Sequence, residues 1–197
     1  MPVAESPALC HLAGEMLLPP TLTLGDDDLV LRDWQERDAP ALEPVCGEWD
    51  ICQFTTVPWT YSVGAARAWI ARLGERRANG SGLALAITHR DRPIPMGNVN
   101  LVRFSADGRE AALGYWLAPA ARGHGFAVGA AQLLCAWGFQ ELRLARIEMA
   151  ILPENAASHG VAKRLGAQRE GVRVASHESG GQRWDMVIYS LREADLS

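Results

Sequence analysis

The sequence lacks the cysteine patterns of a metal site or a disulfide framework. Its four cysteines are scattered, with neither a CxxC pair nor a histidine series beside them, at Cys10, Cys46, Cys52 and Cys135. Structural zinc sites and disulfide-stapled folds both need regular cysteine spacing. We therefore expect no metal, and a reducing compartment in which the thiols act as small apolar side chains.

Long apolar runs and an excess of positive charge are missing as well. No stretch reaches the roughly eighteen apolar residues that span a bilayer, and no basic segment precedes an apolar run near the N-terminus. The net charge is -4, which argues against the broad basic surface that nucleic-acid binding needs. These absences predict a soluble, unprocessed, cytoplasmic protein with neither a membrane nor a nucleic-acid partner.

What is present fits one α/β domain. The chain has 197 residues, of which 48% are hydrophobic, enough to bury a sizeable core. We find no internal repeat and no second domain. We expect the domain over residues 29–194, preceded by a tail or arm over residues 1–28 that contains the acidic run Asp26-Asp27-Asp28.

Local patterns predict the first elements of this domain. A strand at 29–32 precedes a short helix that runs to about Val45, with Asp38 as its cap, because an Asx side chain satisfies free amides at a helix start. Residues 46–61 are typical of a loop. Residues 62–79 have apolar positions at helical spacing and end in Asn79-Gly80, which predicts a second helix.

The rest of the domain alternates predicted strands with two helices. A polar turn with Asp91, Pro93 and Pro95 closes the first hairpin. A nearly all-apolar central helix is expected at 125–141, and a short helix at 155–165. Strands are expected at 83–88, 97–104, 111–117, 146–152, 168–176 and 184–191.

The segment between the strand at 111–117 and the central helix reads Arg122-Gly123-His124-Gly125-Phe126-Ala127. A small-residue turn ahead of a helix exposes consecutive backbone N–H groups and meets the positive end of the helix dipole, which favours a phosphate or pyrophosphate. A dinucleotide fingerprint is disfavoured because its sixth position does not match, and a P-loop because Gly-Lys-Ser/Thr is absent. A plain glycine loop that only allows close packing is the remaining alternative.

In these residues the sequence resembles the GNAT superfamily of acyl-CoA N-acyltransferases. The signature Arg/Gln-x-x-Gly-x-Gly/Ala is matched by Arg122, Gly125 and Ala127. The order of predicted elements also agrees, over roughly residues 29–191. More narrowly, the segments 119–125, 151–158 and 165–171 look like the branch that includes the ribosomal-protein alanine N-acetyltransferases, a branch that many small-molecule acetyltransferases share.

The resemblance implies a fold, a co-substrate and a set of residues that bind it. It implies a mixed, mostly antiparallel central sheet with helices on both faces, acetyl-CoA as acyl donor and a primary amine as acceptor. Amides of the turn would hold the pyrophosphate, and the backbone at the end of the preceding strand would pair with the pantetheine arm. The residues implied in coenzyme binding are Leu117, Ala118, Arg122, Gly123, His124, Gly125, Ala127, Val128, Asn155 and Ser158.

Ser158 is the candidate acid for the chemistry. Transfer from a thioester to an amine needs an unprotonated amine, oxyanion stabilisation and a proton for the departing thiolate, but no nucleophilic cysteine. Helical spacing places Ser158 on the inward face of its helix, beside Asn155. The alternative is a small buried serine bonded to its own helix. The resemblance implies that Ser158 protonates the coenzyme thiolate.

Glu178 is the candidate base. It has the same strand parity as Val172 and Val174, and it resembles a glutamate that some alanine acetyltransferases carry seven residues before an aspartate, here Asp185. An ordinary solvated charge is the alternative reading. His177 is the runner-up, with the opposite parity.

Aromatic residues in the 46–61 segment are candidates for the wall of an acceptor pocket, namely Trp49, Phe54 and Trp59. The alternative is that they cap the core. A non-catalytic acyl-CoA-binding protein, and transfer of another acyl group such as succinyl, stay open, as do the acceptor and the oligomeric state, a homodimer included.

Overall fold

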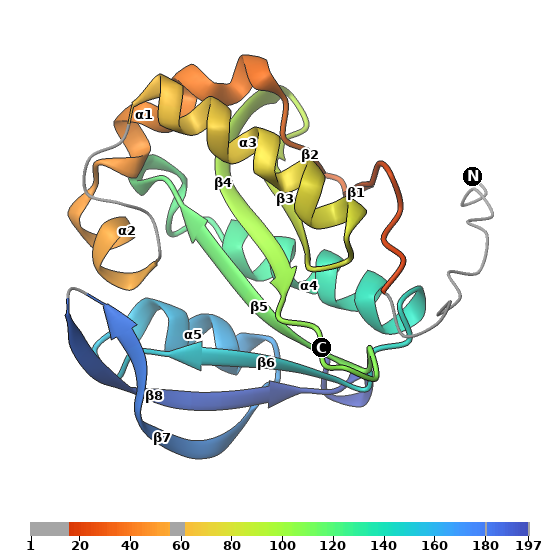
Figure 1. The fold of residues 1–197 in the computed structure, drawn as a ribbon, viewed down its shortest axis with the longest axis vertical. Helices are drawn as coiled ribbons and strands as arrows, with labels where there is room; N and C mark the ends of the chain where they lie inside the picture. Colours follow the sequence, from red (N-terminus) through yellow and green to blue (C-terminus); the bar gives the residue numbers. More distant parts are fainter. Residues whose placement is uncertain (1–15, 56–61, 180, 197) are drawn as a thin grey trace.

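The computed structural model describes residues 16–55, 62–179 and 181–196, which form one twisted sheet with helices on both faces (Figure 1). The strands are β1 Thr23–Gly25, β2 Leu29–Asp33, β3 Gly82–His89, β4 Arg92–Val102, β5 Glu110–Leu117, β6 Arg146–Ile151, β7 Gln168–Ser179 and β8 Gln182–Leu191. The helices are α1 Ala39–Cys46, α2 Trp49–Phe54, α3 Val63–Ala78, α4 Phe126–Gln140 and α5 Ala156–Arg164. The predicted fold class is confirmed.

One pair of strands in the sheet is parallel, and it is incomplete. The strand order is β1-β2-β3-β4-β5-β6-β8-β7, and within the described residues the β5–β6 pair alone is parallel. These two strands pair only where residues 110–112 face residues 146–148. Beyond Ala112, the edge of β5 that faces β6 has no strand partner in the described part of the chain. This edge can therefore accept an extended ligand.

Side-chain alternation along the strands divides the core between the two faces of the sheet. Leu85 and Ile87 belong to the main core, which also contains the buried sides of α4 and α5. Ala86 points the other way, into a smaller cluster with Trp34 and Ala66 under α1 and α3. Period-two alternation in β3 thus serves both layers.

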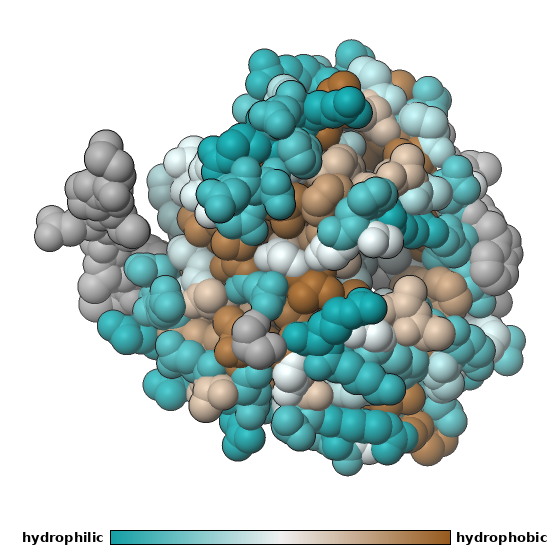
Figure 2. Space-filling model, turned by 180° about the vertical axis from the view of Figure 1, so that it is seen from behind, coloured by the Kyte–Doolittle hydropathy of each residue, from teal (hydrophilic) through white to brown (hydrophobic). Residues whose placement is uncertain are grey.

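Helix α4 is the central helix that the sequence predicts. Its residues Ala130, Ala131, Leu134 and Cys135 are fully buried. Seen from behind, hydrophobic residues gather in the middle of the molecule between hydrophilic surroundings (Figure 2). None of the helices in the described ranges is long and apolar enough to cross a membrane.

Three local predictions are wrong. The segment predicted as a loop contains α2, although residues 56–61 lie outside the described part. Asp38 precedes α1 but does not cap it, because its carboxylate binds the Arg32 guanidinium at 2.7 and 2.9 Å and accepts the Gln35 amide. The predicted turn after β3 is shorter than expected, since β4 already begins at Arg92 and includes both prolines.

The sheet begins inside the predicted N-terminal arm. Residues 23–25 form β1 and pair with β2 in antiparallel register. Met16, Leu18, Leu22 and Leu24 pack against the main core. The described part of this segment is thus integrated with the domain.

Candidate functional site

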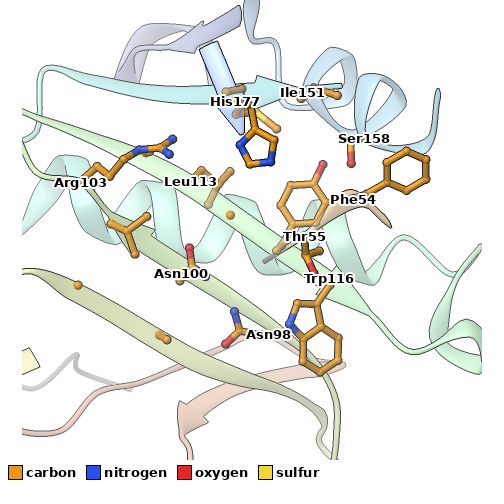
Figure 3. A pocket seen from close by; sticks show the side chains of 18 of the residues that line it. Phe54, Thr55, Asn98, Asn100, Arg103, Leu113, Trp116, Ile151, Ser158 and His177 are labelled. Atoms are coloured by element: carbon orange, nitrogen blue, oxygen red, sulfur yellow. The ribbon is translucent and has the colours of Figure 1, made fainter. Parts of the chain in front are cut away.

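Two pockets meet at the splayed edge of β5. The first, here called the glycine-turn pocket, has a volume of about 790 Å³ and is lined by residues 122–129, the end of β5, α2 and α5. The second, the sheet-face pocket, has about 760 Å³ and lies between α3, strands β3 to β6 and β7 (Figure 3). Residues that line both pockets mark their junction: Phe54, Thr55, Tyr115, Trp116, Asn155 and Ser158.

The glycine turn exposes backbone amides as the sequence predicts. Gly123 and Gly125 have φ of +81° and +82°, and a Cβ at either position would meet nothing within 4 Å. Glycine is therefore needed here because it adopts the left-handed backbone conformation, and not because a side chain would clash with neighbouring atoms. Among the described residues, no side chain caps α4, and the first amides that bond backwards are those of Val128 and Gly129, to the Gly125 carbonyl. The amides ahead of Val128 meet the positive end of the helix dipole.

The Arg122 side chain is engaged within the protein. Its Nε and Nη2 donate to the Leu117 carbonyl at 3.1 and 3.0 Å, and its Nη1 pairs with the Asp50 carboxylate. This hydrogen bond with Arg122 holds the pKa of Asp50 below its usual range, against a smaller upward effect of burial. Arg122 thus ties the end of β5 to α2 and brings α2 over the glycine-turn pocket.

The open edge of β5 belongs to residues other than Ala118. The Ala118 amide donates to the Met96 carbonyl at 2.8 Å, which occupies it. In an antiparallel pair, alternate residues direct their backbone groups to opposite sides. Tyr115 and Leu117 therefore direct their N–H groups to the β6 side, where no strand pairs beyond Ala112. Of the two residues that the resemblance implied here, Leu117 has its N–H group on the open side and Ala118 does not.

Ser158 lies at the junction, on the first turn of α5. The Asn155 side-chain oxygen accepts the Ser158 amide at 3.0 Å and caps this helix. Val161, Ala162 and Leu165 are buried on the same face. The expected inward position of Ser158 is therefore what the helix geometry produces.

Tyr115 is a residue of the junction that sequence reasoning missed. Burial raises the pKa of its phenol to about 12, and contact with the Ser158 hydroxyl offsets part of this rise. Within the described residues the buried phenol oxygen has no partner at full hydrogen-bond geometry. A tyrosine in a mostly buried strand is typical of core, so the only available signal was its position beside the glycine turn.

The structure places His177, and not Glu178, in the sheet-face pocket. Glu178 does share a face with Val172, as predicted, but Val172 pairs with Val187 of the main core, on the opposite side of the sheet from the pocket. The Glu178 side chain is 69% exposed and lies 3.8 Å from Arg183. The prediction that Glu178 points into the cleft is wrong, because the apolar face of β7 was taken for the cleft face.

Comparison with known proteins identifies the chain. Residues 28–168 match the family model of the acetyltransferase (GNAT) domain. The chain belongs to the GNAT acetyltransferase family. It is an acetyl-CoA-dependent acyltransferase, as the sequence resemblance implied.

Related proteins support the GNAT assignment over most of the chain. An uncharacterized N-acetyltransferase, YoaA of Bacillus subtilis, is 25% identical over 85% of this chain and 95% of its own length. A putative ribosomal N-acetyltransferase of the same organism, YdaF, is 32% identical over 48% of this chain and 52% of its own. The structure of Mycobacterium smegmatis RimJ in complex with CoA-disulfide superposes with a TM-score of 0.79, at 23% identity, covering 89% of this chain and 88% of that one.

The aromatic wall predicted for the acceptor side of this GNAT domain is described only in part. Phe54 lines both pockets, at the end of α2 (Figure 3). Trp59 and the side chain of Trp49 lie outside what the structure describes. Trp69 and Trp116, which the sequence did not single out, line the sheet-face pocket.

Two asparagines of β4 supply polar groups to the same pocket. The Asn98 side-chain oxygen accepts the Trp34 indole N–H at 3.0 Å, so its amide group is oriented by the protein. The Asn100 side-chain oxygen is buried without a hydrogen-bond partner among the described residues. It lies over Gly114, where a Cβ would come within 2.7 Å of it.

No activated thiol or metal cluster is found in the described part of this GNAT domain. Cys52 and Cys135 are buried and form no disulfide among the described residues; burial raises the pKa of Cys135 to about 12 and also raises that of Cys52. A protonated thiol is a poor nucleophile. No group of three or more His, Cys, Asp or Glu side chains is placed to hold a metal ion in the described ranges.

Proposed function

We propose that this GNAT enzyme transfers the acetyl group of acetyl-CoA directly to a primary amine of a peptide N-terminus or a small molecule. The observation that carries the proposal is the meeting of two pockets at Ser158 and Tyr115. One pocket contains the glycine turn, and the other reaches the same point from the opposite side. A thioester in the first pocket would therefore face an amine in the second.

The glycine-turn pocket is suited to coenzyme A. We assign the pyrophosphate to the amides of residues 123–127, where glycine conformation and the helix dipole favour an anion. The pantetheine arm would pair with the open β5 edge at Tyr115 and Leu117, in the manner of an added strand. Asn155, whose side-chain oxygen caps α5, lines this pocket, and we assign its side-chain N–H group to a carbonyl of this arm.

Ser158 and Tyr115 are the proposed acid pair. When the amine attacks the thioester carbonyl, the C–S bond breaks and the sulfur leaves with its electron pair, so a proton must reach it. The Ser158 hydroxyl contacts the Tyr115 phenol, whose raised pKa keeps it protonated. Ser158 would protonate the thiolate, with Tyr115 supporting its orientation or resupplying the proton.

His177 is the proposed base or amine-orienting group. It lines the sheet-face pocket from β7, on the pocket wall opposite Asn98 and Trp116 (Figure 3). An imidazole can accept the proton that the acceptor nitrogen loses as it attacks as a neutral amine and becomes an amide. Direct transfer fits the burial of both described cysteines, which argues against a thiol intermediate on them.

Coenzyme binding is tested by calorimetric titration of acetyl-CoA into the wild type and Gly125→Trp. The bulky side chain should obstruct the pyrophosphate and weaken binding by at least about tenfold. Gly74→Trp is the matched control, because Gly74 is exposed on α3 with nothing within 4 Å of its Cβ position. A wild type that fails to bind acetyl-CoA would overturn the proposal.

Transfer is tested by thiol release from acetyl-CoA in the presence of a panel of primary amines. Amine-dependent release, with product mass increased by one acetyl group, supports the proposal. Tight acetyl-CoA binding without release for any amine would favour a non-catalytic acyl-CoA-binding protein instead.

A further inference from the structure

The far end of the sheet-face pocket is lined by arginines from two separate elements. Arg72 and Arg76 come from the C-terminal half of α3, and Arg103 directly follows β4. Figure 3 shows Arg103 at the end of the pocket away from Phe54 and Ser158. A further arginine on the β7 side, Arg173, is already paired with Glu148 at 3.1 and 3.0 Å.

Negative charge is missing around these arginines. The described residues that line the sheet-face pocket include no aspartate or glutamate. No carboxylate of the described residues forms an ion pair with Arg72, Arg76 or Arg103. The segment 56–61 has no charged side chain in its sequence. Among the described residues the pocket end is thus positive, in a chain of net charge -4.

The local structure does not by itself favour this arrangement. Arg72 and Arg76 are four residues apart on one helix face, where like charges are unfavourable. Arg103 has φ of +52°, a left-handed conformation that non-glycine residues seldom adopt. The Arg76 guanidinium lies over Gly82, with Nε and Nη2 3.4 Å from where a Cβ would be. An anionic ligand would offset the repulsion between Arg72 and Arg76.

The β4–β5 register gives the distance between the arginine end of the pocket and the junction at Tyr115 and Ser158. Val99 of β4 pairs with Tyr115 at the junction, and Arg103 follows Val99 by four residues. Four residues of extended strand span about 13 Å. The carboxylate of a succinyl thioester lies only about 4 Å beyond the reacting carbonyl, so it would not reach the arginines. Asn98 and Asn100 line the interval with polar groups.

We infer that the acceptor is an extended, peptide-like amine with a carboxylate near its third or fourth residue, held by Arg72, Arg76 and Arg103. A peptide rises about 3.4 Å per residue, so a carboxylate at this distance from the amine matches the pocket. Asn98 and Asn100 line the pocket between the two ends, so the acceptor would run past polar side chains. The inference rests on the proposed function and adds the charge and length of its acceptor.

The test is calorimetric binding of tetrapeptide amides to the full chain saturated with coenzyme A. Ala-Ala-Glu-Glu amide should bind about tenfold more tightly than Ala-Ala-Gln-Gln amide, with an advantage that shrinks as salt is raised. Tetra-alanine with a free carboxyl end, compared with its amide, distinguishes a terminal carboxylate from an acidic side chain as the source of the anion.

Variants assign the effect to the arginines. Arg72→Gln/Arg76→Gln, and separately Arg103→Asn, should each remove most of the preference for glutamate without changing acetyl-CoA binding. Arg67→Gln is the matched control, because Arg67 lies on the same helix outside the pocket, weakly paired with Glu36 at 3.5 Å. Equal binding of the two peptides by the wild type, or an unchanged preference in both variants, would overturn the inference.

Activity separates this inference from the proposed function. A glutamate preference in binding that depends on the arginines, without acetylation of the bound peptide, would leave the anion site standing and count against the transfer reaction. Acetylation of both peptides with equal binding would support the transfer reaction and count against the anion site.

Discussion

At the scale of single residues, the junction combines groups that are weak acids on their own. A serine hydroxyl ordinarily gives up a proton with difficulty, and burial raises the pKa of Tyr115 to about 12. Both groups therefore stay protonated at neutral pH, which suits donors to a departing thiolate. Their contact, together with the glycine-turn pocket on one side and the sheet-face pocket on the other, gives this pair its proposed role.

Replacing Ser158 by alanine should lower kcat by about 100-fold, the lower end of the range for general acid–base groups. Tyr115→Phe should lower kcat less, because Ser158 remains. Acetyl-CoA affinity, measured by calorimetry, should stay within about twofold in both variants. A Ser158→Ala enzyme with wild-type kcat would show that this hydroxyl is only a small residue at the junction.

The glycines of the turn should matter for stability as well as for binding. Gly125→Ala places a side chain at φ of +82°, which costs about 1–2 kcal/mol for an L-residue in a left-handed conformation. Gly74→Ala in exposed α3 should instead stabilise the protein by up to about 1 kcal/mol. Denaturant unfolding of both variants checks the opposite signs. Equal effects would mean that the turn relaxes to another conformation.

At the scale of elements, the two faces of β7 determine which of its side chains line the sheet-face pocket. Val172 lies on the side of the sheet that carries the main core, where it pairs with Val187 but is itself exposed. Arg173 and His177 lie on the other side and line the sheet-face pocket. The irregular pairing between Arg173 and His177 contains two extra residues in β7, which leaves this facing unchanged. Apolar character alone therefore points to the wrong side of this strand.

We expect His177→Gln to lower kcat by at least about tenfold, since it removes the proposed base from the sheet-face pocket. Glu178→Gln, its neighbour on the exposed face, should remain close to wild type. Steady-state kinetics with a good acceptor makes the comparison. The opposite ranking would restore Glu178 as the base.

At the scale of the whole molecule, an ion-pair network holds together the half of the sheet that carries His177. Arg146 bridges Glu110 on β5, Glu148 on β6 and Glu170 on β7, and Arg173 adds a second bond to Glu148. The network joins β5, β6 and β7 next to the point where β5 and β6 separate. It therefore supports the strand separation that leaves the edge of β5 open beyond Ala112.

This network predicts how stability depends on pH. The pKa of Glu170 is lowered chiefly by its hydrogen bond with Arg146; that of Glu148 is lowered by Arg173 and Arg146 despite the opposing effect of burial. Carboxylates with depressed folded-state pKa values stabilise the protein above the unfolded pKa, and that stabilisation is lost as pH falls. Thermal midpoints should therefore drop below about pH 4.3. Arg146→Gln should lower the midpoint at pH 7 and flatten this dependence; an unchanged slope would contradict the assignment.

The sequence by itself determined the features that local chemistry produces. The glycine turn, the apolar α4 behind it, and the inward face of α5 with Ser158 could all be derived, because each depends on residues a few positions apart. The occupied Ala118 amide, in contrast, could not be foreseen without the β4–β5 register.

Only the tertiary structure determined which pocket each of these side chains lines. The position of Tyr115 at the junction follows from the separation of β5 and β6, and that of His177 in the sheet-face pocket from the facing of β7. The arginines meet because α3 lies next to the end of β4. Short-range patterns specify a residue's conformation and its face on an element. Which pocket that face lines depends on pairing between residues far apart in the chain, and this pairing is set by the packing of the whole sheet.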